Sequence, residues 1–214
     1  MDIDTLTDRK GPTMSTSLKP LSATGLDLLF REARTANTFT DEEVTDKQLQ
    51  QIYDLVKFGP TSFNGQHLRV VFVRSKEARE RLVQHMIETN QPKTAAAPLV
   101  AILAADLEFH EYLPKLYPPF PMAKDFFFSE APVREEEAVF NASIQIGYFI
   151  LAVRAVGLAA GPMGGFDAEG VAKEFFSDGR LKPLLVVNLG KPGKDSHFPD
   201  RLPRLDYDEA VSTL

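Results

Sequence analysis

The chain has 214 residues, of which 43% are hydrophobic and 25% charged, and its formal net charge is -6 at pH 7. This composition supplies a sizeable core for one domain, and the negative charge gives no general attraction for nucleic acid or an anionic membrane. Because there is no cysteine, disulfides, thiolate zinc sites and a cysteine nucleophile are excluded, and a cytoplasmic location is expected.

Residues 1–20 are polar and lack an apolar run, so we expect a flexible arm rather than a signal peptide or membrane anchor. Residues 21–214 are then one domain. A helical pattern of leucines begins near Thr24. A clearer helix follows, with Thr45 as its expected N-cap and apolar residues at helical spacing, and it stops at Gly59-Pro60.

The next segments predict a sheet with helices around it. Val70–Arg74 is expected to be a strand, and Lys76–Glu88 an amphipathic surface helix. A connection leads from there to Leu99–Ala105, whose unbroken apolar run is typical of a central strand. Phe109–Ser129 is rich in aromatic residues and too broken by proline to form a long helix, which suits a lid or a partner-facing surface.

Glu135–Val156 is the most apolar helix predicted, with apolar residues on more than one face. Polar residues interrupt it, so it is expected to be a core helix at a subunit interface, buried on nearly all sides, and not a membrane span. A glycine-rich loop should follow, and Asp167 should cap a helix over Ala168–Phe176 before a buried strand at Leu184–Leu189. Helices alternating with three or four strands predict an α+β domain with a small sheet.

Several familiar functional motifs are absent. There is no phosphate-binding G-x-x-x-x-G-K-[ST], no G-x-G-x-x-G after a strand and no G-x-S-x-G. The four histidines, His67, His85, His110 and His197, lack the spacing of metal ligands, so no metal site is expected. Rossmann, P-loop and serine-hydrolase chemistry therefore have no support.

Five separate segments each carry polar or small residues that suit a phosphate or the edge of a heteroaromatic ring. Taken singly, each has an ordinary explanation as a helix end or a turn. The residues are Arg31, Arg34, Thr35 and Asn37; Thr61, Ser62, Asn64 and Gln66; Asn90 and Lys93; Pro162, Met163, Gly164 and Gly165; and Arg201 with Arg204.

Together these segments read ARTANTF, PTSFNGQ, NQPK, GPMGGFD and DRLPRL, and their order and spacing resemble those of the nitroreductase family of flavoproteins. The resemblance runs from about Leu26 to the C-terminus. It implies a nitroreductase-like fold, in which helices flank a small, mixed and mainly antiparallel sheet and one long central helix is buried. It also implies bound FMN, NADPH or NADH as electron donor, and a homodimer with its FMN sites at the interface.

The resemblance assigns roles to the residues. Arg34, Arg201 and Arg204 suit the FMN phosphate, because arginine offers a bidentate fork. Asn37, Asn90 and Lys93 suit the N1/O2 edge of the ring, where Lys93 would tune the flavin. Backbone N–H groups of Gly164 and Gly165 would face N5. Thr61, Ser62, Asn64 and Gln66 would reach from the second subunit, and Arg31, Thr35, Pro60, Pro162 and Met163 would complete the cofactor site.

The nearer resemblance is to the malonic semialdehyde reductase branch, through YDLVKFGPTS, KTAAAP, YLPKL and RLPRLDYDEA. It implies reduction of malonic semialdehyde to 3-hydroxypropanoate in pyrimidine breakdown, with Arg69 as a candidate contact for the substrate carboxylate or, alternatively, an ordinary charged residue at the start of a strand.

Phe63, Gln66 and His67 depart from this branch and resemble the general nitroreductase loop. The alternatives are a general nitroaromatic or quinone reductase, a flavin-binding module without turnover, and an interaction protein that uses the aromatic segment.

Overall fold

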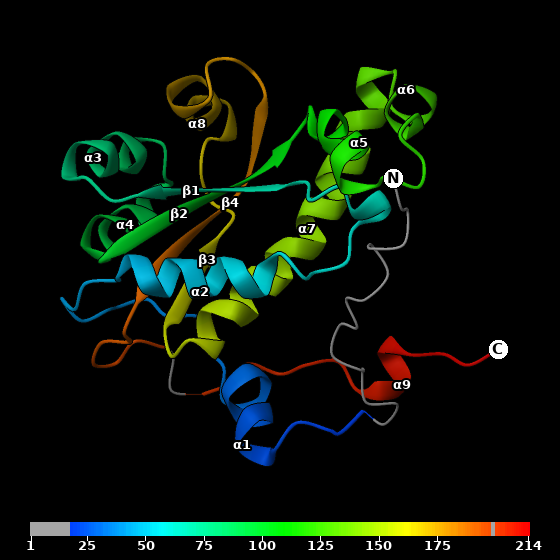
Figure 1. Cartoon of the computed structure of the whole chain (residues 1–214). Helices are drawn as coiled ribbons and strands as arrows, with labels where there is room; N and C mark the ends of the chain where they lie inside the picture. Colours follow the sequence, from blue (N-terminus) through cyan, green and yellow to red (C-terminus); the bar gives the residue numbers. More distant parts are fainter. Residues whose placement is uncertain (1–17, 198–199) are drawn as a thin grey trace, which may run out of the picture.

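The computed structural model describes residues 18–197 and 200–214. The predicted N-terminal arm, residues 1–20, therefore falls almost wholly outside the described residues. The described part of the chain forms a sheet with helices on both faces, as Figure 1 shows.

The sheet has four strands in the order β1-β2-β4-β3, and every neighbouring pair is antiparallel. The predicted small sheet is confirmed. The expected mixture of parallel and antiparallel strands was wrong, because the described residues contain no parallel pair. The strands are β1 (Leu68–Val73), β2 (Leu99–Asp106), β3 (Ala159–Met163) and β4 (Leu181–Gly190).

Strand β3 was expected to be part of a glycine-rich loop, and this prediction was wrong. Glycine and proline weaken the strand signal, but β3 lies at an edge of the sheet, where a proline is tolerated. Gly161 is needed there because a Cβ atom would lie 2.4 Å from the carbonyl oxygen of Ala36. The close approach of residues 34–38 to this strand depends on the tertiary structure, so local sequence patterns do not predict it.

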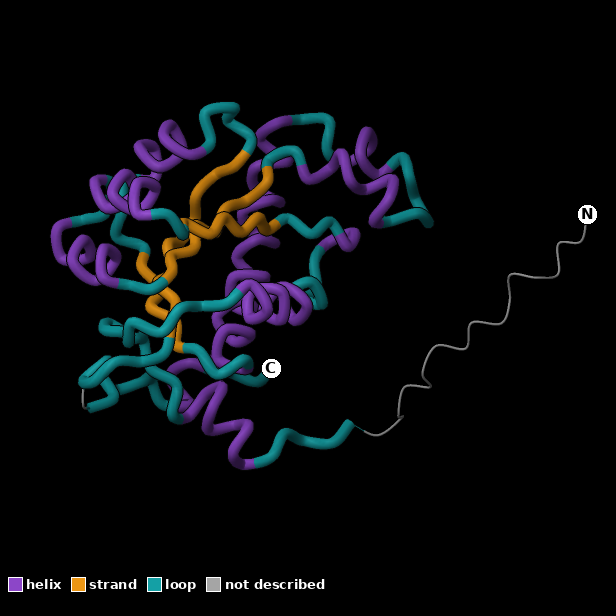
Figure 2. Tube along the Cα trace, turned by 60° about the vertical axis from the view of Figure 1, so that its left-hand side comes forward, coloured by secondary structure: helices purple, strands orange, loops and turns teal. Residues whose placement is uncertain are grey.

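Strand β2 is buried along its whole length, and its side chains alternate between two cores. Leu99 and Leu103 pack with α2 (Asp46–Val56) and α7 (Ala131–Ala155) on one face. On the other face, Ile102 joins a second core. That core is covered by α3 (Lys76–Gln84), α4 (Gln91–Ala96) and α8 (Ala168–Phe175). Figure 2 shows the strands between these two helical layers.

The short helices gather at the two ends of α7 (Figure 1). At one end lie α1 (Ala23–Leu26), the π-helical η1 (Asp27–Arg31) and α9 (Tyr207–Ala210). At the other end lie η2 (Ser62–Asn64), η4 (Phe109–Tyr112), α5 (Leu113–Leu116) and α6 (Ala123–Phe127). The prediction that Phe109–Ser129 contains no long helix is confirmed.

Local capping signals were read correctly. The Thr45 side chain accepts a hydrogen bond from the Gln48 N–H in a full capping box, and Asp167 caps α8. The expected connection after α3 was wrong in part, because it contains η3 (Glu88–Asn90) and α4. Pro92 in the first turn of α4 favours a helix there, since its missing N–H is not needed at that position.

Helix α7 has the length and composition of a membrane span, but it packs against the sheet and α2 as a core helix. Within the single chain it is not buried on nearly all sides, and the subunit interface that the sequence predicts for it stays a prediction. Its second apolar face is open in the single chain, with Phe140 64% and Tyr148 41% exposed. The helical pattern alone does not say whether an apolar face meets the same chain or another molecule.

Candidate functional site

A cleft of about 440 Å³ lies at the C-terminal end of α7. Arg34, Arg201 and Arg204, which the resemblance assigns to the FMN phosphate, line this cleft together with Thr35. Arg154, one of the polar residues that interrupt the apolar helix, lines it as well. The remaining lining residues are Leu29, Phe30, Ala33, Leu151, His197, Asp200 and Leu202.

The arginines of this cleft are held mostly by backbone carbonyls. Arg154 donates to the carbonyl oxygens of Leu29 and Arg34 at 3.4 and 3.2 Å. Arg201 donates to those of Arg31 and Ala33. Carbonyl oxygens do not neutralise a guanidinium, and the four lining arginines outnumber the one lining carboxylate, Asp200, so the cleft carries net positive charge. Burial, together with the neighbouring charge of Arg201, lowers the pKa of Arg154 below its usual range.

Arg31 does not line this cleft. Its guanidinium pairs with Asp27 one helical turn away at 2.7 Å and donates to the carbonyl of Ala23. The structure therefore gives Arg31 a local role in the first helical segment, and its predicted contact with a cofactor stays a prediction.

A second group of predicted residues lies together beside the first. The Lys93 ammonium is 3.5 Å from the Asn37 side-chain oxygen. Buried Asn90 donates its amide to the Gly165 carbonyl at 3.0 Å, so the segments around residues 37, 90 and 165 meet. Residues 34–37 join this group to the arginine cleft, because Arg34 and Thr35 line the cleft and Asn37 lies beside Lys93.

The two glycines of this group face different surroundings. A Cβ atom on Gly165 would lie 2.5 Å from Ile87 and 2.9 Å from the Asn90 amide, so only glycine fits. A Cβ atom on Gly164 would meet nothing within 4 Å, and Gly164 is exposed. Its backbone is therefore accessible to a flat ligand. Met163, in contrast, is buried in β3 against Thr94, and Pro162 belongs to the same strand.

The PTSFNGQ loop lies far from these groups within one chain, near the other half of α7. Ser62 N–H donates to the Asn141 side chain at 2.8 Å. Because Asn141 and Arg154 are 13 residues apart on α7, about 20 Å of helix separates the loop from the arginine cleft. The structure therefore brings together four of the five predicted segments, and leaves Pro60, Thr61, Ser62, Asn64 and Gln66 apart.

Asn141 and Gln145 on α7 were missed as functional residues. Gln145 is buried, accepts a hydrogen bond from Leu68 N–H at 2.9 Å and reaches the Gln66 side chain at 3.4 Å. Two amide side chains four residues apart on an otherwise apolar helix were the available signal, since that spacing puts both on one face. They hold the loop and the strand that follows it.

His67 lies directly behind the loop and is fully buried. Its ring contacts that of Phe109, with 3.9 Å between the centroids and the ring planes tilted by 45°, and neither ring nitrogen has a hydrogen-bond partner among the described residues. Burial, and secondarily the charge of Arg69, lowers the pKa of His67 to about 4. The ring is therefore neutral at neutral pH. Within the described ranges, no cluster of residues suits a metal ion.

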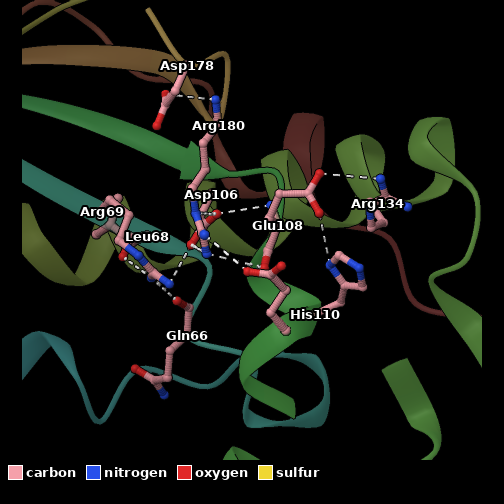
Figure 3. A network of polar contacts seen from close by, with 10 residues as sticks. Gln66, Leu68, Arg69, Asp106, Glu108, His110, Arg134, Asp178 and Arg180 are labelled. Atoms are coloured by element: carbon pink, nitrogen blue, oxygen red, sulfur yellow. Dashed lines mark hydrogen bonds and ion pairs between the residues drawn. The ribbon is translucent and has the colours of Figure 1, made fainter. Parts of the chain in front are cut away.

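Arg69 is engaged by other groups of the protein (Figure 3). Its guanidinium pairs with the buried carboxylate of Asp106 at 2.6 Å and donates to the carbonyls of Gln66 and Leu68 at 2.6 and 3.0 Å. These contacts support the alternative that Arg69 is a charged residue at the start of a strand with a structural role. Its role as a substrate contact stays a prediction.

Comparison with known proteins shows the family of the chain. The model of the nitroreductase family matches residues 30–191. A Streptomyces griseus protein, provisionally named an NADH dehydrogenase/NAD(P)H nitroreductase, is 69% identical over 188 residues, which cover 88% of this chain and 95% of that protein. A Stenotrophomonas maltophilia protein with the same provisional name is 50% identical over 89% of this chain and 96% of that one.

Solved structures show the same fold. A provisionally named nitroreductase of Bacillus subtilis superposes with a TM-score of 0.80 at 24% identity, covering 89% of this chain and 99% of that one. A provisionally named nitroreductase of Exiguobacterium sibiricum, solved in complex with FMN, gives a TM-score of 0.75 at 17% identity, covering 94% and 100%. From the family match and these identities, we conclude that the chain belongs to the nitroreductase family.

Proposed function

We propose that this protein is an FMN-dependent NAD(P)H oxidoreductase. The observation that carries the proposal is the continuity of the two groups of residues. The segment 34–37 joins the arginine cleft to the Asn37, Asn90 and Lys93 group. A cationic cleft beside an accessible glycine backbone and a lysine fits a flat ligand with a phosphate at one end.

The chain's residues fit FMN in chemical type. Arg34, Arg201 and Arg204 would hold the phosphate dianion, and the exposed backbone at Gly164 leaves room for the ring. Lys93 and Asn90 would place a cation and an amide beside it, where they stabilise negative charge. When bound, FMN takes a hydride from NAD(P)H and passes two electrons to an acceptor. The protein's part is to bind, orient and exclude water.

The proposal includes a homodimer, because the PTSFNGQ loop does not reach the arginine cleft of its own chain. An exposed apolar patch extends over α2 and α7 and includes Phe58, Tyr53, Phe140 and Tyr148. Residues 200–214 are exposed throughout and carry further apolar side chains at Leu202, Leu205 and Tyr207. Surfaces of this kind are buried when two copies associate, and a second copy would bring its loop to the cleft.

For the acceptor, we propose malonic semialdehyde, which two electrons and two protons convert to 3-hydroxypropanoate. The support is the sequence resemblance through YLPKL and RLPRLDYDEA. A nitroaromatic or quinone is the second candidate. It is favoured by the aromatic residues beside the loop: the Phe63 ring lies 5.3 to 5.7 Å from those of Phe127, Tyr117 and Phe128. Planar acceptors stack well on such rings.

The test is anaerobic turnover of the purified protein with NADH and with NADPH, using malonic semialdehyde, a nitroaromatic and a quinone side by side. We expect a yellow protein whose flavin absorbance is bleached by at least one nicotinamide and restored by the correct acceptor. A colourless protein that FMN does not reconstitute would refute the proposal. Bound FMN without turnover of any acceptor would instead indicate a flavin-binding module.

A further inference from the structure

We propose that Asp106 and Arg69 are positioning residues that hold the PTSFNGQ loop in its ligand-binding conformation. The inference rests on the proposed function, because it concerns the loop assigned to the flavin site. It gives Arg69 a different role from that of a substrate contact. The evidence lies in the network drawn in Figure 3.

The loop has a backbone conformation that needs external support. Phe63, Asn64 and Gln66 all have positive φ angles, between 50° and 52°. L-residues rarely adopt this left-handed region, because Cβ comes close to the following carbonyl. Three such residues within four positions persist only where the surroundings hold them.

Arg69 holds the C-terminal end of the loop. One nitrogen of its guanidinium donates to the carbonyl of Gln66, the last left-handed residue, and to that of Leu68. The other terminal nitrogen pairs with Asp106 at 2.6 Å. The planar fork thus fixes the position of the Gln66 peptide relative to the end of β2.

Asp106 is the fixed point of this network. Its side chain is 0% exposed and is bound on its other side by Arg180 at 2.9 and 3.1 Å. Its backbone N–H also donates to the carbonyl of His67 at 2.9 Å. A buried carboxylate is stable only when it is paired and hydrogen-bonded, and two guanidinium groups meet that condition here. The charge of Asp106 therefore keeps Arg69 in place.

The same network supports the base of the aromatic segment. Tyr112 lies against both guanidinium groups, 5.2 Å from Arg69 and 5.5 Å from Arg180. Arg180 also pairs with Glu111 at 3.1 Å. One buried carboxylate thus sets the position of two segments: the PTSFNGQ loop through Arg69, and residues 108–112 through Arg180.

The chain offers a matched control at the other end of β1. Arg74 pairs with Glu43 and Asp46 and donates to the Val44 carbonyl, so it also joins carboxylates to a backbone carbonyl. It lies five residues from Arg69, about 17 Å along an extended chain. It does not contact the loop in the described structure.

The test compares Arg69→Lys and Asp106→Asn with Arg74→Lys. Hydrogen exchange of peptide 61–66 is measured without FMN, and FMN dissociation constants are measured on protein shown to be folded by circular dichroism. We expect roughly tenfold faster exchange in the loop and roughly tenfold weaker FMN binding for the first two variants, which corresponds to about 1.4 kcal/mol. Arg74→Lys should leave both within about twofold while it lowers the melting temperature.

Unchanged loop exchange in folded Arg69→Lys, or an equal change in Arg74→Lys, would overturn the inference even if the wild type binds FMN. Should Asp106→Asn fail to fold, the Arg69→Lys variant decides alone. This variant should fold, since position 69 is 30% exposed and lysine keeps the positive charge. If the wild type binds no FMN, the proposed function fails, and the exchange measurement still tests whether Arg69 and Asp106 hold the loop.

Discussion

At the residue scale, Arg34 is the residue proposed to hold the FMN phosphate. It lines the cationic cleft, and no carboxylate forms an ion pair with it within the described part of the chain. We predict that Arg34→Ala weakens FMN binding by about 1.5 to 3 kcal/mol, the usual contribution of a charge-assisted hydrogen bond. Equilibrium titration with FMN measures this.

Arg81→Ala is the control for that titration, because Arg81 pairs with Glu174 in the helical layer on the opposite face of the sheet. Its FMN dissociation constant should match the wild type. Equal affinity in the wild type and the Arg34 variant would contradict the phosphate assignment.

His67 makes a second prediction at the residue scale. Its folded-state pKa of about 4 is lower than the usual histidine value of 6.5, so protonation favours the unfolded chain. The stability from this residue is present above pH 6.5 and is lost as the pH falls toward 4. Linkage gives a loss of about 2 kcal/mol at pH 5.

Urea unfolding of the wild type and of His67→Phe at pH 8 and pH 5 tests this prediction. The phenyl ring keeps the contact with Phe109 and cannot be protonated. The wild type should lose about 2 kcal/mol more than the variant between the two pH values. Parallel losses would show that the buried imidazole does not set the pH dependence.

At the scale of elements, the PTSFNGQ loop follows the C-terminal end of α2, and the stability of this helix depends on the cap at its N-terminal end. The Thr45 hydroxyl accepts from Gln48 N–H, and the Gln48 side chain accepts from Thr45 N–H. Thr45→Ala should lower the free energy of unfolding by about 1 kcal/mol, measured in urea.

FMN affinity of the folded Thr45 variant should stay unchanged, since Thr45 and Gln48 do not line the arginine cleft and their side chains hydrogen-bond to each other. Ser75→Ala, at the N-cap of α3, should give a loss of similar size. A large fall in FMN affinity with Thr45→Ala would mean that α2 moves the loop.

At the scale of the whole molecule, we propose that the exposed face of α7 lies in the interface between two copies of the chain. Phe140 is 64% exposed in the single chain, and a charge there would be buried in a dimer without a partner. Phe140→Glu should therefore give monomers in analytical ultracentrifugation, together with loss of FMN if the loop comes from the second subunit.

Lys173→Glu, an exposed change on α8 across the sheet, should leave the assembly and the bound FMN unchanged. A Phe140 variant that is monomeric yet retains FMN at wild-type affinity would show that one chain forms the whole site.

The amino-acid sequence by itself determined the α+β class, the caps at Thr45 and Asp167 and the apolar strand β2, because these depend on local periodicity and short-range hydrogen bonds. Only the tertiary structure decided the remaining features. Strand β3 depends on a close backbone approach at Gly161, and the open face of α7 looks the same in sequence as a buried one. Arg69 is a charged residue on a strand until the fold brings Asp106, 37 residues away along the chain, to its guanidinium.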